Sequence, residues 1–333
     1  MNTDSPALTT GNAPKSAVPL RRILVVLIVG MALYFGYAMW QGLEKLRAGL
    51  EHFHWIAFAA ACALAFGNYV LRFFKWEFYL ARLEIRGVNK LDSFLIFLSG
   101  FVLTVSPGKV GEVFKSVVLE ETYGVPAPKT APIVVAERVT DLIGVIVLIL
   151  IGSLGFSGGI VPVAIGSTLV IVLLAVISSR KLSMGLIALT RRLPGRLGTF
   201  GPKLEVAYGS LSVLVTFRNL VAPTLMSIGA WSLECMALWV ILWGFGEPVS
   251  APLATFFYAT STLMGAVIPV PGGLGVTEAA LRSQMIEIGK VSPDVSTDAM
   301  YLVRFATLWF AVLVGFVALA ALKRRHPNLL KGN

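Results

Sequence analysis

The 333-residue chain is poor in charged residues, and this shortage excludes most soluble proteins. Charged residues make up 14% of the sequence, hydrophobic residues make up 56%, and the mean hydropathy is +0.79. A soluble core of that composition would lack the polar residues needed to cover its surface. A lipid bilayer removes this requirement because it is itself an apolar solvent. The composition therefore indicates an integral membrane protein.

Cysteine and histidine are also scarce, which argues against metal sites and disulfide frameworks. The two cysteines, Cys62 and Cys235, lie in apolar runs, where small core residues are expected. The three histidines have no metal-ligand spacing between them. Motifs of serine hydrolases, zinc proteases and nucleotide-binding proteins are absent as well. We expect no metal, no cofactor and no enzyme activity, with a membrane transferase acting on a polyprenyl phosphate as the alternative.

Six apolar stretches are long enough to cross a bilayer, which takes roughly 20 helical residues. They cover residues 22–40, 54–71, 133–152, 161–178, 221–243 and 299–322. Two further apolar regions, Ser93–Val105 and Ala254–Val270, end in Pro-Gly breaks, and short amphipathic helices follow them at Gly111–Leu119 and Thr277–Ile288. Short helix, break and short helix is typical of a re-entrant hairpin, and a pair of short or tilted spans is the alternative. The predicted fold is an all-α, polytopic membrane bundle.

The net charge is +10, and the basic residues behind it are distributed unequally between the two predicted sides of the membrane. With the N-terminus in the cytoplasm, 22 of the 28 Lys and Arg residues fall in cytoplasmic segments and four in outer segments. This bias follows the positive-inside rule and predicts that both termini are cytoplasmic. It places Arg72, Lys75 and Lys115 on the cytoplasmic side, and we expect Arg72 and Lys75 to be anchors at the membrane edge. No basic face with aromatic stacking residues accompanies the charge, so no nucleic-acid partner is expected.

These features divide the chain into a long transmembrane domain between two short polar tails. The first tail, rich in Ser, Thr and Pro, is expected to be disordered. The domain contains two repeat halves joined by a basic cytoplasmic linker. The predicted bounds are 1–19 for the first tail, 20–325 for the domain, about 54–152 and 221–322 for the halves, 179–220 for the linker and 326–333 for the second tail.

Two Pro-Gly breaks with similar flanks indicate an internal repeat. They read Pro107-Gly108-Lys109-Val110-Gly111-Glu112 and Pro271-Gly272-Gly273-Leu274-Gly275-Val276-Thr277-Glu278. A span with an early arginine follows each break, 31 residues after the first proline and 33 after the second. Three predicted crossings separate the breaks, so the first hairpin enters from the cytoplasm and the second from outside. Inverted repeats with broken helices are a recurring plan of transporters, and chance convergence is the alternative.

Charged residues inside the spans need partners or a function, because inserting each one at the centre of a membrane helix costs about 2.5–3.5 kcal/mol of free energy. Glu137, Arg138 and Asp141 lie early in one span. Arg138 and Asp141 share a helix face, which predicts a structural pair, the lining of a headgroup cavity, or both. Guanidinium groups suit bidentate phosphate contact, so we expect Arg138 and Arg304 to bind a lipid phosphate alternately from the two sides.

Arg304 has no acidic residue close to it on its own helix, so Glu278 or Glu234 is its expected partner. Glu112 and Glu278 lie at helix starts, where the helix dipole stabilises them or where one of them couples transport to protons. Lys109 is expected to attract anionic headgroups. The backbone at the two breaks is expected to turn and approach an anionic ligand, or to allow tight helix packing, at Pro107, Gly108, Gly111, Pro271, Gly272, Gly273 and Gly275.

Several motifs follow one another along the chain: Arg72 and Trp76, the P-G-x-x-G-E break, Ala136-Glu137-Arg138-x-x-Asp141, the Pro-Gly-Gly-Leu-Gly-x-x-Glu segment, and Arg304. With them, residues 20–322 resemble the transmembrane region of the lysylphosphatidylglycerol synthase family, the flippase-like part without the synthase domain. In that family the membrane part is taken to translocate aminoacylated phospholipid between leaflets. Related single-domain members are associated with hopanoid or polyisoprenoid-linked lipids.

The resemblance implies that the protein flips an amphiphilic lipid across a bacterial inner membrane. The lipid would be a phospholipid or a polyprenyl- or hopanoid-related molecule. No synthase domain is expected, since the sequence ends eleven residues after the last predicted span. A scaffold subunit for a separately encoded lipid-modifying enzyme is a further alternative, and such an enzyme is also a possible partner of a flippase.

Overall fold

The computed structural model describes residues 50–106, 111–153, 201–268 and 270–330, with a few residues between 164 and 172. Every regular element within these ranges is helical, in agreement with the predicted all-α class. In chain order they are α3 (Trp55–Arg82), α4 (Lys90–Ser99), η1 (Gly100–Leu103), α5 (Phe114–Tyr123), α6 (Ala127–Thr130), α7 (Pro132–Gly152), α10 (Gly201–Leu214), α11 (Phe217–Gly244), α12 (Ala251–Val267), η5 (Pro271–Gly273), α13 (Val276–Glu287), α14 (Pro293–Arg304), η6 (Phe305–Trp309) and α15 (Phe310–Arg325).

Three of the described helices are long and apolar enough to cross a membrane. They are α3, α11 and the continuous helix α14–η6–α15, and they correspond to the spans predicted at 54–71, 221–243 and 299–322. A fourth helix, α7, has 21 residues and matches the prediction at 133–152, although charged residues interrupt its apolar sequence. The predicted span at 22–40, most of 161–178 and much of the predicted tails and linker lie outside the described residues.

Helix α3 is longer than the sequence predicted, because it continues from Leu71 to Arg82. Its buried residues keep the spacing of one helix face through this extension: Asn68, Tyr69, Arg72, Lys75, Trp76 and Tyr79. Arg72 and Lys75 therefore lie on the inward face of the helix, with exposed fractions of 5% and 0%. The prediction that these two residues are anchors at the membrane edge is wrong.

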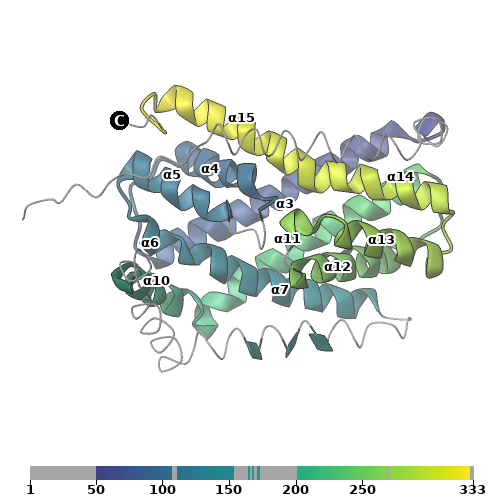
Figure 1. Ribbon diagram of the computed structural model, residues 1–333, viewed down its shortest axis with the longest axis horizontal. Helices are drawn as coiled ribbons and strands as arrows, with labels where there is room; N and C mark the ends of the chain where they lie inside the picture. Colours follow the sequence, from purple (N-terminus) through teal and green to yellow (C-terminus); the bar gives the residue numbers. More distant parts are fainter. Residues whose placement is uncertain are drawn as a thin grey trace, which may run out of the picture.

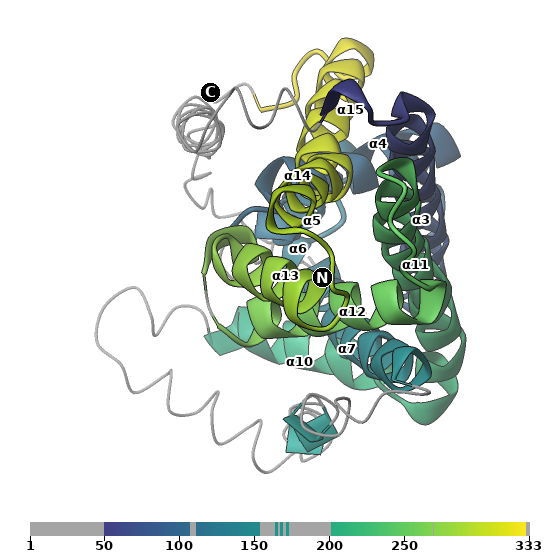
Figure 2. The ribbon, with the colours of Figure 1, turned by 90° about the vertical axis from the view of Figure 1, so that its right-hand side faces the viewer.

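Two helical hairpins lie at opposite ends of the molecule. Helices α4 and α5 occupy the end at which α15 terminates, whereas α13 and its connection to α14 occupy the other end (Figure 1). Each hairpin packs against a long helix of the other half: α4 and η1 contact α15, and α12 contacts α7. Figure 2 views these helices nearly end-on, with α3 beside α11.

The helix breaks that end α4–η1 and α12 meet inside the molecule. After α12 the chain passes through Gly272, Gly273 and Gly275, all with positive φ, which a side chain on the α-carbon disfavours. A Cβ atom added to Gly272 would lie 3.2 Å from Cγ1 of Val105, which follows η1. The two breaks are therefore in direct contact, although residues 107–110 lie outside the described part of the chain.

One π-helical turn, η6, separates α14 from α15. The hydroxyl of Tyr69 on α3 donates a 3.2 Å hydrogen bond to the carbonyl oxygen of Thr307 within this turn. A π-turn loosens the regular backbone pairing of a helix, so its carbonyl groups are open to such partners. The turn immediately follows Arg304.

Candidate functional site

A cavity of about 560 Å³ lies between the two halves, at the level where the helix breaks meet. Three arginines from three different helices are part of its wall: Arg72 of α3, Arg138 of α7 and Arg304 of α14. Asp141 and Glu234 add two carboxylates, and most of the remaining wall is apolar or aromatic. Arg138 is the most accessible arginine, since 22% of its side chain is exposed, against 6% for Arg72 and 8% for Arg304.

Glu112 connects two of the cavity arginines. Its Oε2 atom lies 3.2 Å from Nη2 of Arg72 and 3.1 Å from Nη2 of Arg138. Glu112 is itself only 1% exposed and precedes α5, the helix that follows the first break. This carboxylate therefore holds the first hairpin against both α3 and α7.

Asp141 is the second carboxylate of the first half. Its Oδ1 atom accepts hydrogen bonds from Nζ of Lys75 at 2.5 Å and from Oγ of Ser227 at 2.9 Å. Its Oδ2 atom lies 3.2 Å from Nη2 of Arg138, so the pair predicted from their spacing on one helix face is confirmed. Ser227 belongs to α11, and Asp141 thus ties helices of both halves together.

Lys115 and Glu137 form a further ion pair, with 2.7 Å between Nζ and Oε2. Both side chains are almost fully buried, and the Lys115 ammonium also lies 4.8 Å from the ring centre of Trp76. The sequence predicted a cytoplasmic-side position for Lys115 but not this burial, which arises because the start of α5 directs the lysine side chain toward Glu137 of α7.

In the second half, Glu278 holds Arg304. The distance from Nε of Arg304 to Oε1 of Glu278 is 2.6 Å, which confirms one of the two partners expected for this arginine. The Nη2 atom of Arg304 donates a 2.8 Å hydrogen bond to the carbonyl oxygen of Gly272, within the second break. The other carboxylate oxygen of Glu278 accepts the backbone N–H of Gly275 at 2.7 Å. Arg304 is therefore bound to both sides of the break.

The two halves carry the same ion pair at the same spacing. Glu112 and Arg138 are 26 positions apart, and so are Glu278 and Arg304. In each half the glutamate follows the helix break and the arginine lies on the next long helix. Other residues of the two halves can be matched by counting the same number of positions from each glutamate or arginine. By this count, Lys115, Glu137 and Asp141 correspond to Leu281, Val303 and Thr307.

Glu234 lies on α11 in another part of the cavity wall. Its Oε2 atom accepts a 2.8 Å hydrogen bond from the hydroxyl of Tyr258 on α12. Trp231, three positions earlier on α11, and Tyr69 of α3 are also in the wall. This part of the cavity therefore combines a carboxylate with several aromatic rings.

The structure brings together most of the residues predicted as a site. Arg138, Asp141, Arg304 and Glu234 are in the cavity wall, while Glu112, Glu137 and Glu278 lie behind it as ion-pair partners. Of the glycines and prolines at the breaks, Gly272 and Gly273 are in the wall, and Gly111, Pro271 and Gly275 lie beside it. Pro107, Gly108 and Lys109 lie outside the described residues.

Gly111 acts through close chain packing. A Cβ atom on it would collide with Leu103 and Ser106 across the first break, and its N–H donates a 2.6 Å hydrogen bond to Oγ of Ser106.

Lys75 and Lys115 were not predicted to take part in the buried ion pairs. The signal for Lys75 was its place on the regular buried face of α3, which continues past the apolar stretch.

The cavity has the chemistry of an anion site. Buried arginines tolerate a low-dielectric surrounding only with anionic partners, and a phosphate accepts the same bidentate contacts as a carboxylate. The Nε atoms of Arg72 and Arg138 have no hydrogen-bond partner among the described residues. Within those residues no group of three or more His, Cys, Asp or Glu side chains is arranged to hold a metal ion.

Comparison with known proteins agrees with the resemblance seen in the sequence. A family model described as the lysylphosphatidylglycerol synthase TM region matches residues 22–315. A UPF0104 membrane protein of Methanothermobacter thermautotrophicus is 20% identical over 306 residues, which cover 87% of this chain and 90% of that protein. Another UPF0104 membrane protein of this organism is 28% identical over 89 residues, 27% of this chain and 26% of that protein. The chain is a membrane protein and belongs to the lysylphosphatidylglycerol synthase transmembrane-region family.

Proposed function

We propose that the protein moves an amphiphilic lipid between the leaflets of a membrane, with the lipid phosphate bound in the cavity by Arg72, Arg138 and Arg304. One observation carries this proposal: three arginines from three helices converge on a cavity where two helix breaks meet. The protein does no covalent chemistry on the lipid. The apolar wall of the cavity accommodates the hydrophobic part of the lipid while the guanidinium groups bind the lipid headgroup.

The arrangement of the hairpins supports movement between two sides. We interpret α4–α5 and α12–α13 as re-entrant hairpins that enter from opposite faces of the membrane, since they lie at opposite ends of the molecule (Figure 1). The matched pairs Glu112–Arg138 and Glu278–Arg304 then mark two inverted repeats. In transporters of this plan, the substrate site lies at the repeat interface and one half moves against the other.

The ion pairs supply a way for a phosphate to enter without leaving a buried charge alone. When the phosphate binds Arg138, it replaces one contact of Glu112, which keeps its other contact with Arg72. Arg304 likewise keeps its bond to the Gly272 carbonyl while Glu278 keeps the Gly275 N–H. Each exchange therefore substitutes one anion for another, which costs far less than exposing an arginine to an apolar wall.

Charge at the molecular ends supports an orientation with both termini in the cytoplasm of a bacterial cell. Among the described residues, more basic residues lie at the end where α3 and α15 terminate and α4 begins than at the end of α13. This bias follows the positive-inside rule. Within the described part of the chain, the first end includes Arg82, Lys90, Lys323, Arg324 and Arg325, and the second includes Arg282 and Lys290. A separately encoded lipid-modifying enzyme is the expected source of the substrate.

Reconstitution in vesicles tests the proposal. The purified protein should move phospholipids with a fluorescent acyl chain between leaflets, and Arg138→Ala and Arg304→Ala should each slow this movement by at least about tenfold, the loss expected for one charge-assisted contact. Arg282→Ala is the matched control, because Arg282 is exposed and donates to Thr297. Unchanged movement in both cavity variants would refute the proposal. A new lipid species in the vesicles would instead indicate a transferase.

A further inference from the structure

Lys75 is a fully buried lysine to which the proposed lipid binding assigns no part. Its side chain is 0% exposed and lies where α3, α7 and α11 meet. The ammonium group donates hydrogen bonds to Oδ1 of Asp141 at 2.5 Å, to Oγ of Ser227 at 2.8 Å and to Oγ1 of Thr140 at 3.4 Å. An ammonium group has three N–H donors, so each of them has an acceptor. Among these partners, Asp141 is the one that reaches the cavity wall.

Asp141 is divided between two cations. Its Oδ1 atom accepts the hydrogen bonds of Lys75 and Ser227, whereas its Oδ2 atom lies 3.2 Å from Nη2 of Arg138. Among the described residues, neither this Oδ2 atom nor Nε of Arg138 has a hydrogen-bond partner. An arginine and a carboxylate often form two parallel hydrogen bonds when nothing restrains them. The pair Arg138–Asp141 therefore stops short of the geometry that would hold it most firmly.

The restraint on Asp141 comes from the side of Lys75. To bind Arg138 through both carboxylate oxygens, Asp141 would have to turn its Oδ1 atom away from Lys75 and Ser227. That turn would leave a fully buried ammonium group without its carboxylate, which is strongly unfavourable. Arg138 thus keeps an N–H donor that its carboxylate does not take, and 22% of its side chain is exposed.

We infer that Lys75 is a positioning residue, which restrains Asp141 so that Arg138 stays available to the lipid phosphate. The inference rests on the proposed function and adds to it the residue that sets the phosphate affinity of Arg138. Lys75 itself does not touch the lipid. Without Lys75, the carboxylate of Asp141 would turn toward Arg138 and compete with the phosphate for the guanidinium group.

Calorimetric titration of the full chain in dodecyl maltoside micelles tests this inference. The probe is dihexanoyl phosphatidylglycerol, a soluble phospholipid, and the detergent has no phosphate that would compete with it. Lys75→Met should raise the Kd of the probe by about tenfold, the effect of one charge-assisted contact, because Asp141 then occupies Arg138. Asp141→Asn should lower the Kd, because Arg138 loses its competitor.

The double variant Lys75→Met/Asp141→Asn separates positioning from the mere loss of charge. If Lys75 acts through Asp141, its removal has no further effect once Asp141 is neutral, so the Kd should lie nearer to that of Asp141→Asn than to that of the wild type. If each residue acted only through its own charge, the two effects would cancel. A Kd nearer to the wild-type value would therefore overturn the inference.

A loss of folding does not imitate these results, since it lowers the stoichiometry of binding and not the Kd. Tighter binding by Asp141→Asn is the result that a purely structural ion pair would not give, and weaker or equal binding by this variant refutes the inference. If the wild-type protein binds no probe, the proposed function itself fails.

The matched controls are Lys90→Met and Glu77→Gln, which break another lysine–carboxylate pair. Lys90 lies at the start of α4, where 80% of its side chain is exposed. Both control variants should leave the Kd unchanged.

Discussion

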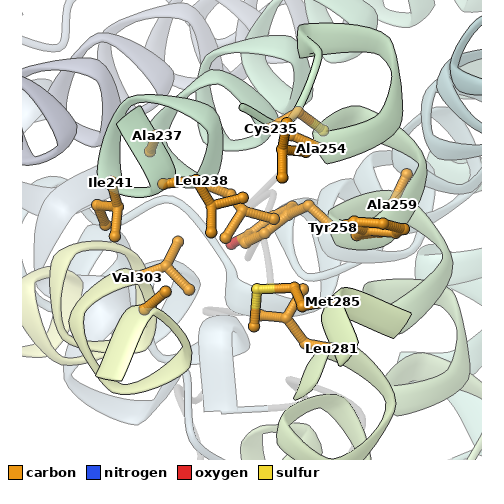
Figure 3. Close-up of a cluster of buried hydrophobic side chains, with 14 of the residues drawn as sticks. Cys235, Ala237, Leu238, Ile241, Ala254, Tyr258, Ala259, Leu281, Met285 and Val303 are labelled. Atoms are coloured by element: carbon orange, nitrogen blue, oxygen red, sulfur yellow. The ribbon is translucent and has the colours of Figure 1, made fainter. Parts of the chain in front are cut away.

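The hairpin and long helix of the first half carry the same glutamate–arginine pair as those of the second half, yet the space beside the pair is filled differently. In the first half Lys115 and Glu137 form a buried ion pair. The matching positions in the second half are Leu281 and Val303, both fully buried in one apolar cluster (Figure 3). Since apolar packing suffices at one of the two places, the ion pair at the other is not required by the fold.

The largest effect is expected from Glu137→Val alone. This change copies the second half at one position only and leaves the Lys115 ammonium buried without its carboxylate. Removing one partner of a buried pair costs about 3–5 kcal/mol. We expect the free energy of unfolding, measured by denaturant titration in detergent micelles, to fall by this amount.

The matched control is the double variant Lys115→Leu/Glu137→Val, which reproduces the second half at both positions. Replacing a buried ion pair by apolar residues of similar size is often neutral, so its unfolding free energy should lie within about 1 kcal/mol of the wild type. If the double variant were as unstable as the single one, the two halves would not be interchangeable at this place. A stable double variant with slower lipid movement would assign the pair to transport.

A smaller effect distinguishes the two glutamates. Glu112 forms ion pairs with two arginines and Glu278 with one, besides its bond from the Gly275 N–H, so Glu112→Gln removes two ion pairs and Glu278→Gln removes one. Each contact contributes about 1.5–3 kcal/mol, and glutamine retains part of it as a neutral hydrogen bond. We therefore expect Glu112→Gln to be the more destabilising variant, by about 1 kcal/mol, in thermal or chemical unfolding. Equal losses would show that Arg72 takes no part in holding the first hairpin.

The smallest effect concerns the ends of the hairpins. Asp92 at the start of α4 accepts hydrogen bonds from Tyr123 at 2.7 Å and from Arg325 at 2.5 Å, and His326 lies 3.0 Å away. At the other hairpin Arg282 donates to the neutral hydroxyl of Thr297. Burial alone would raise the pKa of Asp92, but the hydrogen bonds outweigh it and hold the pKa below its ordinary value.

A carboxyl group with a lowered pKa in the folded state contributes stability above its unfolded pKa and loses it as the pH falls through the folded value. The contribution of Asp92 is thus complete at neutral pH and declines below about pH 4. Asp92→Asn should lower the unfolding free energy by about 1 kcal/mol at neutral pH. The difference from the wild type should shrink in acid, and a difference that is constant down to about pH 3 would contradict this account.

Much of the fold could be predicted from the sequence. Apolar length marked the helices that became α3, α11 and α14–α15, and the Pro-Gly segments marked both breaks. The partner of Arg304 was narrowed to two residues, because an isolated charge within a span requires compensation and few carboxylates were available. These predictions succeed because a single local property, hydrophobic length or an uncompensated charge, decides them.

The inward charges of the first half were not predictable in the same way. Lys75 and Lys115 follow apolar segments, where the positive-inside rule assigns lysines to the membrane edge. Their real partners, Asp141 and Glu137, lie 66 and 22 positions away along the chain. Only the packing of α3 and α5 against α7 brings these charges together. Pattern and spacing along one helix do not contain that information.

The π-helical turn that follows Arg304 distinguishes this arginine from Arg138, its counterpart in the first half. Helix α7 is α-helical throughout, so the direction of Arg138 is fixed by an uninterrupted backbone. A π-turn holds one residue more than an α-turn, and moving that surplus residue out of the turn would rotate α14 against α15 by about 100°. The guanidinium of Arg304 can therefore be re-aimed by a local change of winding, without unfolding either helix. The direction of Arg138 is thus fixed by a regular helix, whereas the direction of Arg304 depends on the winding of the turn beside it.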